Sequence, residues 1–234
     1  MSSTARVIEV FSSLQGEGIH AGQRHLFIRF WNCNMACRYC DTDYKGPYRE
    51  VTGESLLGEA EEFIRRDGPF HAVSLTGGEP LLWAPFLRGW LPGLKTLGQR
   101  TYLETNGTLP LPLQQLMEWI DIVAMDVKPP SATGDRPVWR ENEEFLRVSR
   151  EAGKEVFVKV IVTAGTSDEE VRRSVELVQS VGAEIPLVLQ PVTPWGEARD
   201  PPAPEQIARW KAWASERLHD VRVLPQMHRV WGVR

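Results

Sequence analysis

Short apolar runs of strand length alternate with longer amphipathic segments along most of the chain. The runs that predict β-strands are rich in β-branched and aromatic residues and lie at 25–31, 71–76, 101–105, 121–127, 154–163, 185–191 and 221–225. Between them, apolar residues recur with helical spacing at 52–66, 86–94, 113–119, 141–153, 169–181 and 204–218. Strands that alternate with helices pair in parallel through right-handed crossovers, which predicts an α/β fold. Eight such units need about 250 residues, so we expect an open sheet or a partial barrel of about six strands.

Residues with strong positional preferences mark several helix ends. Thr52 is suited to cap the segment at 52–66, and Ser167 with Glu170 forms the S-x-x-E pattern of a capping box. Pro204 fits the first turn of the helix that it opens. Pro92 is expected to interrupt the segment at 86–94.

Composition narrows the class of protein. The 234 residues are 42% hydrophobic, which is enough for one compact domain, 1–234. A formal charge of -4 and a pI near 5.8 argue against a nucleic-acid partner and favour a small-molecule substrate. The sequence has neither a run of about 18 apolar residues nor the layout of a signal peptide. We therefore expect a soluble, cytoplasmic protein with no membrane partner.

All three cysteines, Cys33, Cys37 and Cys40, lie in the loop after the strand at 25–31. An odd number of closely spaced thiols cannot form a closed set of disulfides, and a reducing compartment keeps them as thiols or metal ligands. The carboxyl ends of parallel strands are where α/β proteins place their active sites. The loop is therefore a candidate metal centre.

Several readings of these thiols compete. Buried structural cysteines would be scattered over core faces. A structural zinc needs a fourth ligand, and the candidates His20, His25 and His71 lack the short spacing of zinc fingers. An ordinary electron-transfer cluster needs four cysteines. The remaining reading is an iron–sulfur cube in which one iron has no protein ligand and is open to a reacting molecule.

Polar residues and glycines follow the other predicted strands. Gly77 and Gly78 can adopt backbone angles closed to other residues and let a ligand approach the main chain, and Glu79 can accept a hydrogen bond from an ammonium group. The next strands end in Glu104, Thr105, Asn106, Asp126, Lys128 and the stretch 190–193. Because parallel strands present their carboxyl ends at one rim, these residues predict one shared site.

The loop C-N-M-A-C-R-Y-C resembles the C-x3-C-x2-C signature of radical S-adenosylmethionine (radical SAM) enzymes, and G-G-E-P at 77–80 resembles their second motif. The resemblance implies a partial (β/α)6-type parallel barrel. It implies that the cysteines hold a [4Fe–4S] cluster and that S-adenosylmethionine chelates the open iron and is cleaved reductively to a 5′-deoxyadenosyl radical. The residues that it implies for cofactor binding are Tyr39, Gly78, Glu79, Glu104, Asp126, Lys128, Gln190, Pro191, Val192 and Thr193.

Further motifs are similar to those of one family within this superfamily, the 7-carboxy-7-deazaguanine synthases. They are SLQGEG, FIRF, CDT, SLTGGEPLL, YLETNGT, DVKPPS, LQPVTP and PQMH. This resemblance implies a lyase that contracts the ring of 6-carboxy-5,6,7,8-tetrahydropterin to 7-carboxy-7-deazaguanine, with loss of ammonia, in queuosine and deazapurine biosynthesis. S-adenosylmethionine would then act catalytically, and no side chain is assigned a catalytic role.

The same resemblance implies a substrate site built by both ends of the chain, 1–24 and 220–234. Its members would be Leu14, Gln15, Gly16, Glu17, Arg29, Thr76, Gln226, His228 and Arg234. A carboxylate such as Glu17 suits the amino and ring N–H groups of a pterin, and the guanidinium of Arg29 suits a two-point grip on the substrate carboxylate. Thr42 is implied as a ligand of Mg²⁺. Arg234 stands where many relatives have proline.

The resemblance also implies an electron donor such as flavodoxin or ferredoxin, and a homodimer. Two alternatives remain at this stage. One is a glycyl-radical-type activating enzyme, which would share the cysteine loop and act on a protein. The other is a non-catalytic zinc-binding protein.

Overall fold

The computed structural model describes residues 4–194 and 200–233. Its strands form one nine-stranded sheet in the order β3-β1-β2-β4-β5-β6-β7-β8-β9. β2 pairs in parallel with β4, and the parallel pairing continues to β9, whereas β1 pairs antiparallel with both β2 and β3. The strands are β1 (Thr4–Leu14), β2 (Arg24–Phe30), β3 (Arg49–Thr52), β4 (Ala72–Gly77), β5 (Thr101–Thr105), β6 (Ile122–Val127), β7 (Glu155–Val162), β8 (Leu187–Pro191) and β9 (Val221–Val223).

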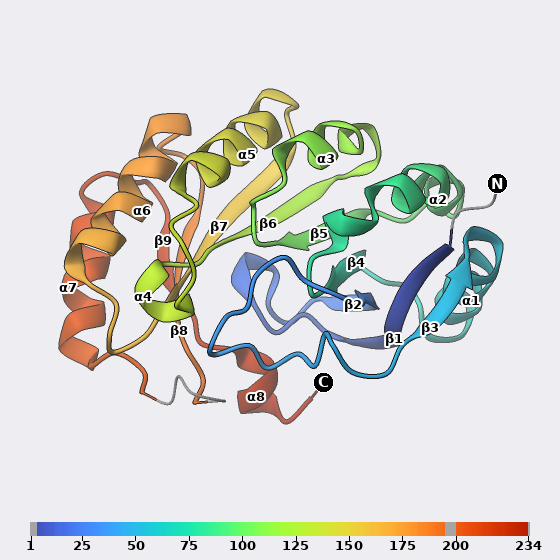
Figure 1. The fold of residues 1–234 in the computed structure, drawn as a ribbon, viewed down its shortest axis with the longest axis horizontal. Coiled ribbons are helices and arrows are strands. Elements are labelled where there is room, and N and C mark those ends of the chain that lie inside the picture. The colour runs from blue at the N-terminus through green and yellow to red at the C-terminus, as the bar shows by residue number, and fades with distance from the viewer. Residues whose placement is uncertain (1–3, 195–199, 234) are drawn as a thin grey trace.

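The sheet bends into an arc, and most helices cover its outer side (Figure 1). The α-helices are α1 (Gly53–Asp67), α2 (Ala84–Thr96), α3 (Pro110–Gln114), α4 (Pro130–Thr133), α5 (Trp139–Glu151), α6 (Asp168–Val181), α7 (Pro204–Ser215) and α8 (Met227–Trp231). Short 3-10 helices are η1 (Gly18–His20), η2 (Pro80–Trp83) and η3 (Met117–Trp119). Among the described residues, no helix has the length and apolar character needed to cross a membrane.

The predicted α/β fold and open barrel are confirmed, with more strands than expected. Every strand predicted from the sequence is present, and the edges of the sheet are β3 and β9, so the arc stays open. The expectation of about six strands was too low: the seven runs predicted as strands are all present, and the antiparallel strands β1 and β3 at the amino-terminal edge were not predicted. β3 has only four residues, and only Val51 among them is buried, so its pattern carries little strand signal.

The helix ends predicted from capping residues are confirmed, but the interruption predicted at Pro92 is wrong. Thr52 accepts a hydrogen bond from the Ser55 amide, and Ser167 accepts one from the Glu170 amide. α2 continues through Pro92, contrary to prediction. Proline removes one backbone N–H, and here the buried face of α2, including Trp90 and Leu94, keeps the helix against the sheet.

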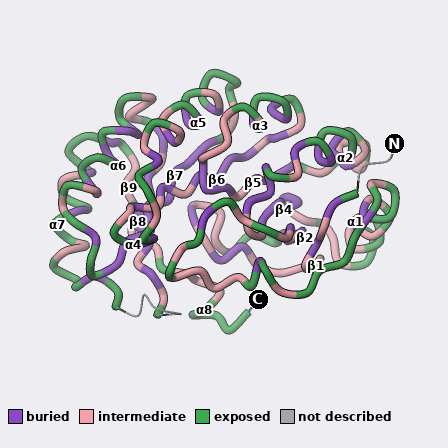
Figure 2. Tube along the Cα trace, in the orientation of Figure 1, coloured by how far each residue is buried: buried purple, intermediate pink, exposed green. Residues whose placement is uncertain are grey.

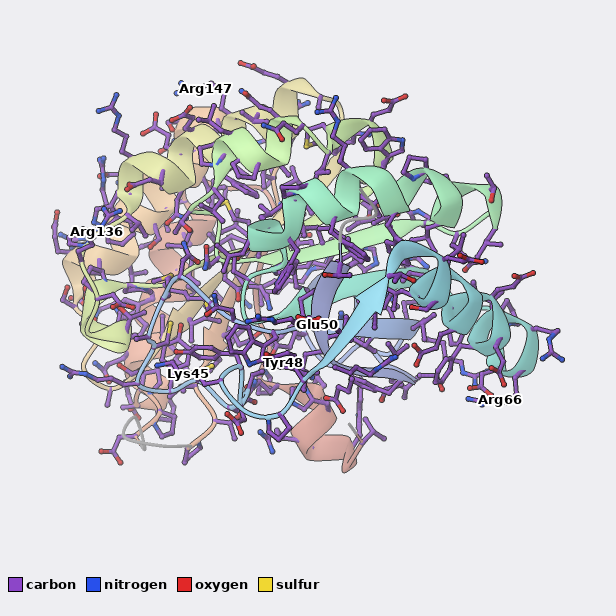
Figure 3. All side chains as sticks on the ribbon, turned by 45° about the vertical axis from the view of Figure 1, so that its right-hand side comes forward. Lys45, Tyr48, Glu50, Arg66, Arg136 and Arg147 are labelled. Carbon is purple, nitrogen blue, oxygen red and sulfur yellow. The ribbon has the colours of Figure 1, made fainter. Side chains whose placement is uncertain are left out.

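Alternation along the strands divides the buried residues into two layers. One face of each strand packs under the helices in the main core, where Leu75, Leu103 and Val158 are fully buried. The other face points into the concave side, where Tyr102 and Phe157 form a smaller cluster. Figure 2 shows the sheet as the buried centre of the molecule, with exposed surface on the outer helices. Charged side chains such as Arg66 and Arg147 project from that helical layer (Figure 3).

Candidate active site

The inner faces of the strands turn polar toward their carboxyl ends. Two residues beyond Tyr102 on the inner face of β5 lies Glu104, and Lys159 lies two residues beyond Phe157 on β7. Thr76, Asp126 and Gln190 lie toward the carboxyl ends of β4, β6 and β8. All of them line one cavity of about 500 Å³. This size is ordinary for a small-molecule site.

The cysteine loop forms one wall of this cavity. Cys33, Cys37 and Cys40 are free thiols, partly buried, and all three line it. Burial raises the pKa of the Cys33 thiol to about 11 and also raises the pKa of Cys37. Because these thiols hold their protons in the ligand-free protein, metal binding must release those protons.

Hydrogen bonds join the glycine motif to the start of the cysteine loop. The Gly78 amide donates to the Phe30 carbonyl over 3.1 Å, and the Glu79 amide donates to the Asn32 carbonyl over 2.9 Å. A Cβ on Gly78 would lie 1.9 Å from the Asn32 oxygen, so only glycine fits. The two motifs therefore form one rigid edge of the site.

Glu79 holds the backbone of this edge through hydrogen bonds and does not line the cavity. Its side chain is fully buried, and its carboxylate accepts hydrogen bonds from the Thr105 hydroxyl and from the amides of Leu81 and Asn106. Burial raises the pKa of Glu79 to about 7 in spite of these bonds. The ammonium contact expected from the sequence stays a prediction, because three donors do not use the whole acceptor capacity of a carboxylate.

A buried ion cluster crosses the floor of the cavity. The Lys159 ammonium contacts the Glu17 carboxylate and lies 3.0 Å from Asp126 Oδ1. Burial alone would raise the pKa of Glu17, but the charge of Lys159 and hydrogen bonds from Lys159, Gln226 and Gln190 hold it well below its ordinary value. Glu17 is therefore ionised.

Two more polar groups connect the amino-terminal strands to the cavity. Arg29 donates from Nε to Glu9 over 2.8 Å and from a terminal nitrogen to the Thr42 hydroxyl over 3.1 Å. Glu104 accepts from Gln15 over 2.7 Å and from Thr76 over 2.9 Å. Burial raises the pKa of Glu104.

The carboxyl-terminal helix α8 lies beside the cavity. Gln226 donates to Glu17 over 2.8 Å, and Arg229 donates to Asp41 over 2.9 Å. The Met227 amide donates to the Gly16 carbonyl over 2.8 Å. The tail therefore links the QGEG turn to the loop that carries the cysteines.

Most residues assigned from the sequence come together here. Those that line the cavity are Leu14, Gln15, Gly16, Glu17, Arg29, Cys33, Cys37, Tyr39, Cys40, Thr42, Thr76, Gly78, Glu104, Asp126, Lys128, Gln190, Val192, Gln226 and His228. Glu79, Pro191 and Thr193 are not among the lining residues. Arg234 lies outside the described residues.

Sequence reasoning missed several residues of the cavity. Among them are Glu9, Asp41, Lys159 and Arg229. Lys159 had a usable signal, since a lysine in the middle of an apolar strand of a parallel sheet needs a buried partner. The pairs Arg29–Glu9 and Arg229–Asp41 join distant segments and left no such signal.

The histidines considered as zinc ligands lie elsewhere. The His71 ring stacks near His20 and His25, with centroid distances of 5.0 and 5.4 Å, at the amino ends of β2 and β4. None of the three lines the cavity. Within 4–194 and 200–233, no three His, Cys, Asp or Glu side chains are grouped as ligands of a single metal ion.

The residues present fit an iron–sulfur cube with a polar cofactor. Three thiols share one wall, which matches three protein-bound corners and one open corner. One buried oxygen of the same cavity, Gln190 Oε1, accepts no hydrogen bond from the described part of the chain. A ligand with a hydroxyl or amino donor would satisfy it.

Comparison with known proteins agrees with this geometry. The family model described as the radical SAM superfamily matches residues 29–178. A 7-carboxy-7-deazaguanine synthase of Geobacter sulfurreducens is 36% identical, with 97% of each chain covered. One of Methanothermobacter thermautotrophicus is 34% identical, with 98% of each chain covered.

Solved structures show the same fold. QueE from Escherichia coli superposes with a TM-score of 0.63 at 20% identity, over 96% of this chain and 95% of that one. A radical SAM methyltransferase from Sphaerobacter thermophilus gives 0.67 at 15% identity, over 92% and 77%.

Proposed function

Since the chain belongs to the radical SAM superfamily and, within it, to the 7-carboxy-7-deazaguanine synthases, we propose that it converts 6-carboxy-5,6,7,8-tetrahydropterin to 7-carboxy-7-deazaguanine with loss of ammonia, a step toward queuosine and related deazapurines. One observation carries the proposal. A single cavity is lined both by the three cysteines and by the QGEG turn, Arg29 and the tail.

The cysteine side of the cavity is the proposed cofactor side. Cys33, Cys37 and Cys40 would hold a [4Fe–4S] cluster, which together with S-adenosylmethionine supplies the one-electron chemistry that removes a substrate hydrogen. The free acceptor of Gln190 and the place of Asp126 in the cavity wall support a role in binding the cofactor's hydroxyl and amino groups. Further proposed contacts are Tyr39, Gly78, Glu104, Lys128, Pro191, Val192 and Thr193, and we infer that Glu79 acts by fixing the backbone of the motif.

The opposite side is the proposed substrate side. The ionised Glu17 would accept N–H groups of the pterin, and Arg29 would bind its carboxylate. Leu14, Gln15, Gly16, Thr76, Gln226 and His228 would complete the wall, so that both ends of the one domain, 1–24 and 220–234, form the pocket. The hydrogen bonds from α8 to Glu17 and Asp41 support this arrangement, which keeps water from the reacting ring.

Other expectations of the family carry over as proposals. Mg²⁺ would bind near Thr42, whose hydroxyl lines the cavity beside Asp41. An electron donor such as flavodoxin or ferredoxin, a homodimer and a cytoplasmic location rest on the family resemblance.

Mass analysis after anaerobic reaction tests the function. The reconstituted protein is incubated with reductant, S-adenosylmethionine and the carboxypterin, and we expect 7-carboxy-7-deazaguanine with release of ammonia. Cys37→Ala should give no product because the cluster loses a ligand, whereas Ser180→Ala, on the exposed side of α6, should match the wild type.

Two outcomes would contradict the proposal. One is product formation by Cys37→Ala. The other is an intact cluster that cleaves S-adenosylmethionine while the pterin stays unchanged, the behaviour expected of an activating enzyme that acts on a protein.

A further inference from the structure

Lys159 is an almost completely buried cation, two strands from the β9 edge of the sheet. It lies on the inner face of β7, in the strand sequence EVFVKVIV, and its side chain is only 2% exposed. Enclosing an ammonium group this far from water is costly unless anions compensate for the lost hydration. Its neighbours therefore define its role.

Carboxylates from three separate elements face this ammonium. Glu17 comes from the turn after β1, Asp126 from β6 at 3.0 Å, and Glu104 from β5 acts through its charge. Burial alone would lower the pKa of Lys159, but these three carboxylates raise it above its ordinary value. Lys159 is therefore charged, and it is the group that makes this concentration of negative charge tolerable.

The two direct partners belong to different sides of the cavity. Glu17 is hydrogen-bonded to Gln226 of the tail, on the side of the QGEG turn. Asp126 accepts from Lys128 over 2.9 Å, and the Lys128 ammonium lies 5.6 Å from the centre of the Tyr39 ring in the cysteine loop. One ammonium therefore stands between the substrate side and the cofactor side.

We propose that Lys159 is a positioning residue that holds Glu17 for the substrate and Asp126 for the cofactor, so that the binding of both ligands depends on one buried cation. This rests on the proposed function, because it assigns the two ligands to the two sides. It adds a residue and a role that the cysteine, GGEP and QGEG motifs do not contain.

Loss of the cation should change the protonation of Glu17. The charged or titratable groups near it are Glu104 of β5, Asp126 of β6, His228 of α8 and, through Gln226, Asp41. Without Lys159, burial and the neighbouring carboxylates all favour the protonated form. Glu17 would then be ionised, with both oxygens free to accept N–H groups, only at high pH, and pterin affinity would fall as the pH is lowered.

Calorimetric titration of the anaerobically reconstituted holoenzyme tests the dependence of both affinities on Lys159. Reductant is left out so that no turnover occurs. The carboxypterin and S-adenosylmethionine are titrated separately between pH 6 and 8. For Lys159→Met we expect both affinities to drop about tenfold or more, because each partner loses a charged contact. Pterin affinity should fall further toward pH 6 in this variant only.

Matched variants separate positioning from general damage. Lys159→Arg keeps the charge and should restore most of the affinity and the flat pH profile. Lys95→Met removes a lysine whose partner, Asp121, lies outside the cavity, and it should leave both affinities unchanged. In a Glu17→Gln background, removing Lys159 should cost much less pterin affinity than in the wild type.

The outcomes are distinct. Wild-type affinities and a flat profile in Lys159→Met would overturn the positioning role. Failure of the wild type to bind the pterin would instead count against the proposed substrate. If Lys159→Met does not fold, Lys159→Met with Glu17→Gln, which removes the opposing charge, is titrated with S-adenosylmethionine, and affinity equal to that of Glu17→Gln would overturn the role.

Discussion

At the scale of single residues, Glu79 has a structural task that its motif does not disclose. Both of its oxygens accept from backbone amides, one from Leu81 and the other from Asn106, 27 positions away. The sequence alone suggests a carboxylate offered to a ligand, since it cannot show which distant amides will reach it. Lys159 is the opposite case, because its apolar neighbours in β7 already identify it as unusual.

Glu79→Gln should therefore destabilise the protein even though it preserves shape. In either orientation of the amide, its NH2 group faces a backbone N–H, so one donor is left without an acceptor. We expect the free energy of unfolding to fall by about 1–3 kcal/mol, measured by urea denaturation. Glu118→Gln, on an exposed position of η3, is the control. Equal stability of both variants would show that the carboxylate is dispensable to the loop.

At the scale of elements, α8 packs closely against Gly16. A Cβ on Gly16 would lie 2.3 Å from Nδ1 and 2.5 Å from Cβ of His228. Because the Cβ of His228 is itself too close, a new rotamer cannot relieve the contact, and the helix backbone must move.

Gly16→Ala should displace α8 and weaken the bonds from Gln226 and Arg229 to the cavity. We expect pterin affinity to decrease about tenfold, measured by calorimetry, and protease cleavage near the tail to become faster. Gly58→Ala, in α1 with nothing near its added methyl, should bind the pterin normally and gain about 0.5–1 kcal/mol in stability. Normal binding by Gly16→Ala would mean that α8 does not shape the substrate site.

The elements also show how far a sequence can be interpreted. The parallel strands from β2 to β8 were predictable because each is a mostly buried apolar run, and the caps at Thr52 and Ser167 were predictable because they are local. β1 and β3 owe their structure to antiparallel pairing with each other and with β2, which a local pattern does not encode. The cysteine wall was predictable, whereas the ion cluster at Lys159 depends on how the strands align.

At the scale of the whole molecule, the amino ends of the strands contain a group of histidines that makes the stability of the protein depend on pH. The end opposite the cavity contains the His20, His25 and His71 cluster against Tyr102. Burial lowers the pKa of His25 to about 3 and also lowers the pKa of His20 and His71.

These shifts predict acid sensitivity with a definite sign. Below pH 6.5, His25 binds a proton in the unfolded chain but not in the folded protein. Its contribution to the free energy of unfolding is therefore fully present above pH 6.5 and is lost as the pH falls toward 3. Each pH unit should cost about 1.4 kcal/mol from His25. Urea denaturation of the protein without its iron–sulfur cluster, between pH 7 and 4.5, measures how the free energy of unfolding depends on pH. His25→Gln should flatten the curve of unfolding free energy against pH, and His219→Gln, at an exposed position, is the control. A curve that His25→Gln leaves unchanged would contradict the assignment of the acid sensitivity to His25.

The bond from Gln226 to Glu17 has a consequence for how the protein is made. The two residues are 209 positions apart, and Arg229, which bonds to Asp41, follows Gln226 by three. During translation the cysteine loop emerges long before the residues that will cover it. The growing chain therefore leaves its thiols more open to solvent until α8 has been synthesised and Arg229 can bond to Asp41.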